Sequence, residues 1–97
     1  MSDHLFVFAR ITPKTEFFDD AKAAIIKIIA STRKEEGCHD FKFYEGRGDG
    51  NLYLYEEWES QAALDCHYAM PYTKAVFESY DAWLASPVEV TKLTQVN

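Results

Sequence analysis

Two segments of the chain alternate like β-strands yet carry large apolar side chains on both faces, and this double-sided pattern constrains the fold most. In residues 4–11 one face holds Leu5, Val7, Ala9 and Ile11, and the other holds Phe6, Phe8 and Arg10. In residues 52–58 one face holds Leu52, Leu54, Glu56 and Trp58, and the other holds Tyr53, Tyr55 and Glu57. A strand with one face in water alternates apolar and polar residues, so we expect both faces of these strands to be covered. Helices of the same chain can cover one face only, which suggests a partner on the other.

The stretches between these strands have helical spacing or turn chemistry. Residues 14–35 repeat apolar side chains at helical intervals, with acidic residues in the first turn and Gly37 suited to end the helix. Residues 46–51 are rich in Gly, Asp and Asn, which predicts a hairpin turn. Ser60 can cap a helix over 61–69, and Pro71 can open another over 72–85.

With strands at 4–11, 38–47, 52–58 and 88–96, the predicted element order is β-α-β-β-α(α)-β. Four short strands with helices packed on one side form an α+β domain of the ferredoxin-like type. We therefore expect residues 1–97 to form a single domain. A domain this small buries a modest share of its surface, and pairing with a second copy is a common remedy.

Charge and composition exclude several classes of function. The net charge is −6, and the Lys and Arg residues form no run, so neither nucleic acid nor an anionic membrane surface is expected as a partner. No apolar run approaches the ~20 residues of a membrane span, and no signal peptide is recognisable, so the predicted location is cytoplasmic. His4, His39 and His67 are scattered, which predicts no metal site. Cys38 and Cys66 are expected to be small buried apolar residues.

One long motif carries a family resemblance. Gly37-Cys38, the run Leu52-Tyr53-Leu54-Tyr55-Glu56-Glu57-Trp58-Glu59-Ser60, and Ala63-Leu64-Asp65-Cys66-His67 followed by Pro71 resemble the antibiotic-biosynthesis monooxygenases. The members most similar in pattern are the small quinol monooxygenases and the autoinducer-2-degrading proteins. The resemblance implies a dimeric α+β barrel, in which two ferredoxin-like sheets pack face to face in a homodimer. It also implies oxidation of small phenols or quinols by molecular oxygen, without a bound cofactor.

The same resemblance implies a pocket between sheet and helices, with Trp58 and His67 as its catalytic positions. Many relatives carry a second histidine just after the helix-breaking proline, where this chain has Tyr72. We therefore expect no mechanism that needs two histidines. Tyr72 is expected to contribute to substrate binding instead.

Two of the candidate site residues have a structural reading as well as a functional one. A neutral imidazole at His67 could accept a phenol's proton, since free imidazole titrates near pH 6.5, or His67 could be a partly buried histidine hydrogen-bonded to the backbone or to a tyrosine. Glu56 lies on an apolar strand face and should not be buried unpaired, and Arg10 is the candidate partner. An Arg10–Glu56 pair could be structural, or it could form the polar end of a substrate pocket.

The first functional hypothesis is therefore a cofactor-independent monooxygenase acting on a small phenol or quinol, with His67 as general base. The alternatives are a dimeric binding protein without oxygenase activity, or an isomerase or degrading enzyme for a small aromatic or carbonyl metabolite. Fold alone does not separate these, because function resides in the site.

Overall fold

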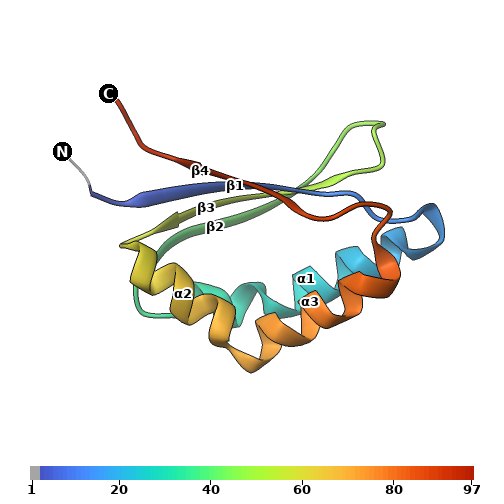
Figure 1. The fold of residues 1–97 in the computed structure, drawn as a ribbon, viewed down its shortest axis with the longest axis horizontal. Coiled ribbons are helices and arrows are strands. Elements are labelled where there is room, and N and C mark those ends of the chain that lie inside the picture. The colour runs from blue at the N-terminus through green and yellow to red at the C-terminus, as the bar shows by residue number, and fades with distance from the viewer. Residues whose placement is uncertain (1–2) are drawn as a thin grey trace.

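The computed structural model describes residues 3–97 as a four-stranded antiparallel sheet with helices on one of its faces (Figure 1). The strand order is β2-β3-β1-β4. The elements are β1 (Leu5–Ile11), η1 (Thr15–Phe17), α1 (Phe18–Arg33), β2 (Cys38–Glu45), β3 (Leu52–Trp58), α2 (Gln61–Ala69), α3 (Pro71–Trp83) and β4 (Glu89–Leu93). This order confirms the predicted ferredoxin-like α+β fold.

The element boundaries differ from the prediction mainly at the ends. The first helix is preceded by a separate turn of 3-10 helix, and α3 begins at Pro71, which needs no backbone hydrogen-bond donor at a helix start. The last strand is shorter than predicted and spans Glu89–Leu93. Residues 88–96 carry polar and apolar side chains on both faces of the predicted strand, so the pattern alone does not mark where pairing with β1 stops.

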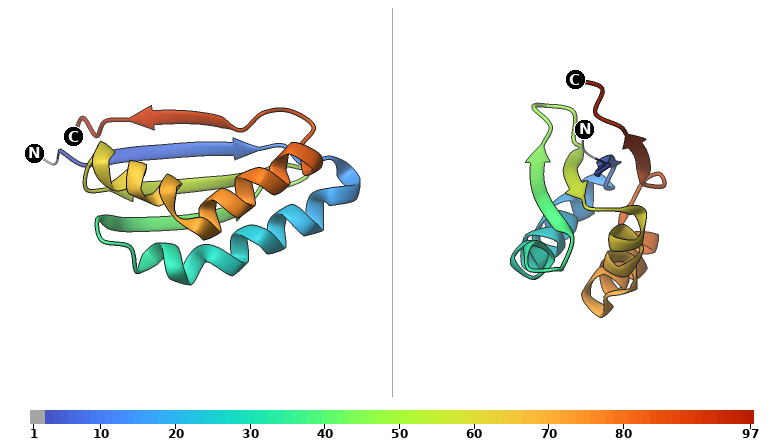
Figure 2. Two further views of the ribbon diagram at one scale, coloured as in Figure 1. Left: turned by 60° about the horizontal axis from the view of Figure 1, so that its bottom comes forward. Right: turned by 90° about the vertical axis from the view of Figure 1, so that its left-hand side faces the viewer.

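The two faces of the sheet have different surroundings. The face toward the helices holds the core, where Val7, Leu52 and Trp58 pack with helix residues such as Ala21 and Leu64. Figure 2 shows that the three helices form a single layer against this face of the sheet. Within that layer, α1 lies to one side of α2 and α3.

The opposite face of the sheet, which we call the outer face, is not covered by helices. Phe8 is 40% exposed and Tyr44 is 50% exposed there, although Phe8 stacks on Tyr53 with ring centroids 5.7 Å apart. Leu93 on β4 is also 42% exposed. The predicted double-sided character of the strands is therefore present, with one apolar face covered and the other open.

Candidate active site

A small cavity lies between the inner face of the sheet and the helices. Its polar lining includes Glu56 from β3, His67 from α2, and Thr73 and Tyr80 from α3. The apolar lining includes Ala9, Ile25, Ile28, Phe41, Leu54 and Val76. About 40 Å³ is open to the centre of a water molecule, which is room for a few waters.

His67 is fixed in this cavity by its helix and by aromatic neighbours. The hydroxyl of Ser60 accepts a hydrogen bond from the backbone N–H of Ala63 at 3.2 Å, which caps the start of α2 as predicted. His67 as a whole residue is 4% exposed, and its ring centroid lies 4.8 Å from that of Trp58 and 5.8 Å from that of Phe41. The predicted inward position of His67 is therefore present, close to Trp58.

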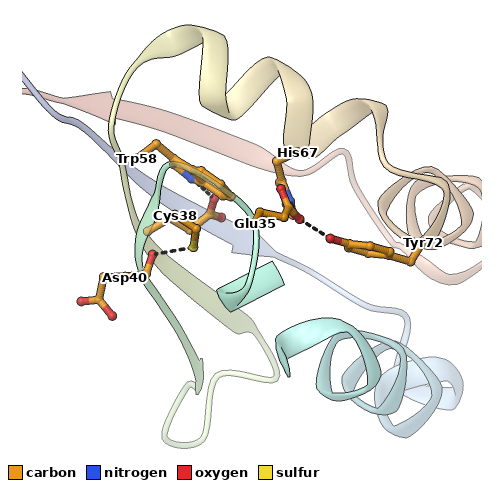
Figure 3. Close-up of polar contacts among 7 residues, drawn as sticks. Glu35, Cys38, Asp40, Trp58, His67 and Tyr72 are labelled. Carbon is orange, nitrogen blue, oxygen red and sulfur yellow. Dashed lines mark hydrogen bonds and ion pairs between the residues drawn. The ribbon is translucent and has the colours of Figure 1, made fainter. Parts of the chain in front are cut away.

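A buried carboxylate that sequence reasoning missed holds the imidazole. Glu35 Oε2 lies 2.9 Å from His67 Nδ1, and both side chains are 5% exposed (Figure 3). The hydroxyl of Tyr72 donates to the same oxygen. An ionised Glu35 selects the tautomer that carries its hydrogen on Nδ1, and this leaves the Nε2 lone pair for a ligand.

Local backbone geometry explains how Glu35 reaches the site. Gly37 ends the turn after α1 with φ +88°, a conformation that favours glycine. A Cβ at this position would lie 2.7 Å from Ala63 Cβ, so glycine also permits α2 to approach the turn closely. The carbonyl of Gly37 accepts a 2.8 Å hydrogen bond from the N–H of Glu59. The turn that carries Glu35 is thereby tied to the start of α2, two turns before His67.

Tyr72 lies against Glu35, and its predicted contribution to substrate binding stays a prediction. Its hydroxyl is bonded to Glu35, so it supports the carboxylate that holds His67. Burial and the neighbouring Glu35 raise the pKa of Tyr72 well above its usual value, which keeps the hydroxyl protonated as a donor.

Glu56 is buried beside Trp58 and lines the cavity. Trp58 Nε1 donates to Glu56 Oε1 at 2.8 Å, because residues two apart on β3 point to the same face. Burial raises the pKa of Glu56 to about 7, with Glu35 adding a smaller repulsion, while the Trp58 hydrogen bond acts in the opposite direction. The carboxyl therefore exchanges a proton near neutral pH, which suits acid–base chemistry.

The predicted Arg10–Glu56 pair is wrong. Arg10 lies on the outer face of the sheet and donates from Nη2 to Glu89 Oε1 at 2.6 Å. Since neighbouring strands β1 and β4 place Arg10 directly opposite Glu89, the register dictates this pairing. Glu56 pairs in register with Val7 of β1 and points to the other face, so the sheet separates the two side chains. Arg10 is therefore remote from the cavity.

The two cysteines differ from each other. Cys38 is partly buried, and its Sγ donates to the Asp40 carbonyl at 3.8 Å (Figure 3). Burial raises the pKa of this thiol to about 11, so it is not a nucleophile near neutral pH. Cys66 is exposed on α2, and its predicted burial is wrong.

Two further classes of site are absent from the part of the chain that the structure describes. Residues 3–97 hold no group of three or more His, Cys, Asp or Glu side chains placed to bind a metal ion. Over the same residues, no helix combines the length and apolar character needed to cross a bilayer.

Comparison with known proteins connects this geometry to a family. The chain is 31% identical over its whole length to a protein named "Putative monooxygenase Rv0793" of Mycobacterium tuberculosis, covering 96% of that protein. The solved structure of Rv0793 superposes with a TM-score of 0.93, covering 98% of this chain and 97% of that one. A protein named "Probable quinol monooxygenase YgiN" of Escherichia coli is 31% identical over 62 residues. The match covers 55% of this chain and 60% of YgiN.

A more distant structure, PA3566 of Pseudomonas aeruginosa, is 24% identical, covers 100% of this chain and 98% of its own, and superposes with a TM-score of 0.93. That likeness supports the fold alone. Residues 5–79 match the family model for antibiotic biosynthesis monooxygenases, and this span includes Glu35, Glu56, Trp58, His67 and Tyr72. The chain belongs to the antibiotic biosynthesis monooxygenase family.

Proposed function

We propose that this protein is a cofactor-independent monooxygenase that oxidises a small phenol or quinol with molecular oxygen. The observation that carries the proposal is the Glu35–His67 pair, which holds a buried imidazole with Nε2 free for a ligand at a cavity suited to an aromatic ring. Membership of the family and the names of the relatives support the same class of reaction.

His67 acts on the substrate's hydroxyl. Nε2 accepts the phenolic proton, and the imidazolium that forms is stabilised by the carboxylate of Glu35 on Nδ1. The resulting phenolate is a far better electron donor to oxygen than the neutral phenol. When a hydroquinone becomes a hydroxy-para-quinone, its ring supplies all four electrons: one oxygen atom enters at a free ring carbon, and the other leaves as water. No external reductant is required.

Glu56 is the second proton-transfer group in this proposal. Its pKa of about 7 lets it hold a proton at the start of the reaction and give it to a reduced oxygen species formed over the ring. Because Glu56 and His67 line the same cavity, proton removal and proton return take place within one site.

The size of the cavity favours single-ring substrates. Phe77, Tyr80 and Val88 line both this cavity and an adjoining surface groove that includes Leu84 and Pro87. Phe77 is 42% exposed and packs edge-on against Tyr68 and Tyr80, with centroids 5.8 and 5.9 Å away. These three residues, Phe77, Tyr80 and Val88, separate the cavity from the groove. A substrate larger than a few water molecules enters by displacing them, and Phe77 is the most exposed of the three.

The direct test is oxygen uptake with a panel of substituted hydroquinones and naphthols, comparing the wild type with His67→Ala. We expect the wild type to consume oxygen and the variant to lose about 10²–10⁴-fold in rate, the usual contribution of a general base. His39→Ala is the matched control, since His39 is exposed and lies outside the cavity lining.

The oxygenase proposal fails if the wild type consumes no oxygen with any member of the panel. Isomerisation or tight binding of the same compounds under anaerobic conditions would then favour the alternative functions. Equal losses in His67→Ala and His39→Ala would remove His67 from the chemistry, even if oxygen uptake is present.

We also propose that the outer face of the sheet is the interface of a homodimer. Phe8, Tyr44 and Leu93 are partly exposed there, and two stacked aromatic pairs, Phe6–Tyr55 and Phe8–Tyr53, give the face a flat apolar surface. A second copy of the same sheet would cover this surface with matching aromatic side chains. Large apolar patches on a soluble domain commonly mark an interface of this kind.

Phe8→Asp should convert the dimer to a monomer, because it places a carboxylate in the centre of the apolar interface. Sedimentation velocity at micromolar concentration is expected to show twice the chain mass for the wild type and the single chain mass for the variant. The control is Ile26→Asp, since Ile26 is 54% exposed and lies on α1, on the helical side of the protein. A monomeric wild type, or a dimer that survives Phe8→Asp, contradicts the outer-face interface.

A further inference from the structure

Two buried hydroxyl groups in the cavity have no hydrogen-bond partner among residues 3–97. They belong to Thr73, which is 3% exposed, and Tyr80, which is 6% exposed, and both side chains line the cavity. Leaving a buried hydroxyl unpaired is unfavourable, and nearly all such groups in native proteins have a partner. The partner of these two hydroxyls must therefore come from within the cavity.

The two hydroxyls lie along one side of the cavity. Thr73 and Tyr80 are seven residues apart on α3, which places them on the same helix face and separates their backbones by about 10 Å along the axis. Between them, Val76 also lines the cavity and provides an apolar surface. Along this side of the cavity, a polar side chain is thus followed by an apolar one and then by a second polar one.

Tyr80 lies at the end of the cavity away from His67. Helix α2 starts directly after β3, whose last residue Trp58 pairs with Leu5 at the beginning of β1. Just after α3, the N–H of Ala85 donates to the Thr12 carbonyl at 2.8 Å, next to the end of β1. The helices therefore run along the whole length of β1, with His67 toward its start and Tyr80 toward its end.

We propose that Thr73 and Tyr80 are specificity-determining residues that bind an oxygen substituent of the substrate, opposite the hydroxyl that His67 deprotonates. This inference rests on the proposed function, since it assigns the substrate's orientation in the same cavity. The ring then lies over Leu54 and Val76, with one polar group at His67 and Glu56 and another at the hydroxyls of α3.

The hydroxyls can discriminate because no side chain or backbone group among residues 3–97 pairs with them. A substrate with a carbonyl or hydroxyl at its far end gains hydrogen bonds, whereas an analogue with a methyl group there keeps both hydroxyls buried and unpaired. Burial raises the pKa of Tyr80, so its hydroxyl remains a donor at neutral pH. A site of this kind rejects the apolar analogue more strongly than a wholly apolar pocket could.

The test is anaerobic calorimetric titration with two single-ring probes of nearly equal size, 1,4-dihydroxybenzene and 4-methylphenol. The measured quantity is the ratio of their affinities, compared among the wild type, Thr73→Val, Tyr80→Phe and the double variant. We expect the ratio to shift about tenfold toward 4-methylphenol in the double variant, with each single variant contributing part of the shift. Tyr44→Phe, on the outer face, is the matched control and should leave the ratio unchanged.

A second readout separates ligand recognition from a structural role. Removing a hydroxyl that pairs with no protein group among residues 3–97 should leave the free energy of unfolding unchanged or raise it, whereas removing a structural hydroxyl should lower it. An affinity ratio that stays the same in the double variant, or failure of the wild type to bind either probe, overturns the proposal. Because the titration involves no turnover, a shifted ratio without oxygen uptake would overturn the proposed oxygenase reaction alone.

Discussion

Replacing Glu35 with glutamine is expected to lower kcat for oxygen uptake by about 10²–10⁴-fold with little change in KM. In the wild type, the carboxylate accepts hydrogen bonds from His67 Nδ1 and from the Tyr72 hydroxyl. The amide of glutamine can instead donate to Nδ1, which moves the ring hydrogen to Nε2. The nitrogen that should accept the substrate's proton would then carry one already. Glu35 is thus a positioning residue that acts through His67.

Controls distinguish this tautomer effect from loss of structure. Glu36→Gln changes the adjacent, exposed carboxylate and should leave kcat unchanged. Tyr72→Phe removes one hydrogen bond to Glu35 and preserves the acceptor for Nδ1, so a loss of less than about tenfold is expected.

The rate of oxidation of a more acidic phenol distinguishes the tautomer effect from a merely structural role of Glu35. Such a substrate is already ionised at the assay pH, so Glu35→Gln should slow its oxidation much less than that of hydroquinone. Equal losses for acidic and ordinary phenols would contradict the proposed role of the Glu35–His67 pair.

The fold was predictable because its signals are local and repeated. Alternation in β1 and β3, the acidic first turn of α1 and the cap at Ser60 each specify one element, and their order leaves few arrangements. The apolar outer face was also predictable, since Phe8 and Tyr53 point there by alternation alone. The start of α1 was harder to predict, because the 3-10 turn ahead of it has the same composition as a helical first turn.

The candidate site was predictable only where strand or helix periodicity determines it. His67 and Trp58 fall on inward positions of α2 and β3, and the structure brings them together. Glu35 was missed because it lies in the turn between α1 and β2, where neither period applies and the charged residues around it resemble an ordinary helix end. Gly37 indicated where the helix ends, but the close approach of this turn to α2 became visible only in the structure.

The misplaced partner of Glu56 has a related cause. The strand pattern showed that a carboxylate on an apolar face needed a partner, and Arg10 was chosen because it lies on an aromatic face of β1. The register pairs Val7 with Glu56, so Arg10, an odd number of positions further along β1, points to the opposite face. The structure provides the Trp58 indole N–H and partial protonation in place of an ion pair.

That partial protonation makes Glu56 a source of pH-dependent stability. Its pKa rises from 4.5 to about 7 on folding because the carboxyl is buried. Between these values the folded protein holds a proton that the unfolded chain has released, so stability must fall as pH rises through this window. The full contribution is present below about pH 4.5 and is lost above about pH 7. A shift of this size corresponds to about 3 kcal/mol.

Glu56→Gln should remove this dependence while keeping the Trp58 hydrogen bond, since the amide oxygen can accept from the indole. The free energy of unfolding by denaturant is expected to fall by about 2–3 kcal/mol more in the wild type than in the variant between pH 5 and pH 8. At pH 8 the variant should be the more stable protein. Glu78→Gln, at an exposed position on α3, controls for the change in net charge. Parallel pH profiles for wild type and Glu56→Gln would show that Glu56 is ionised throughout, and would remove it as a proton donor in the proposed reaction.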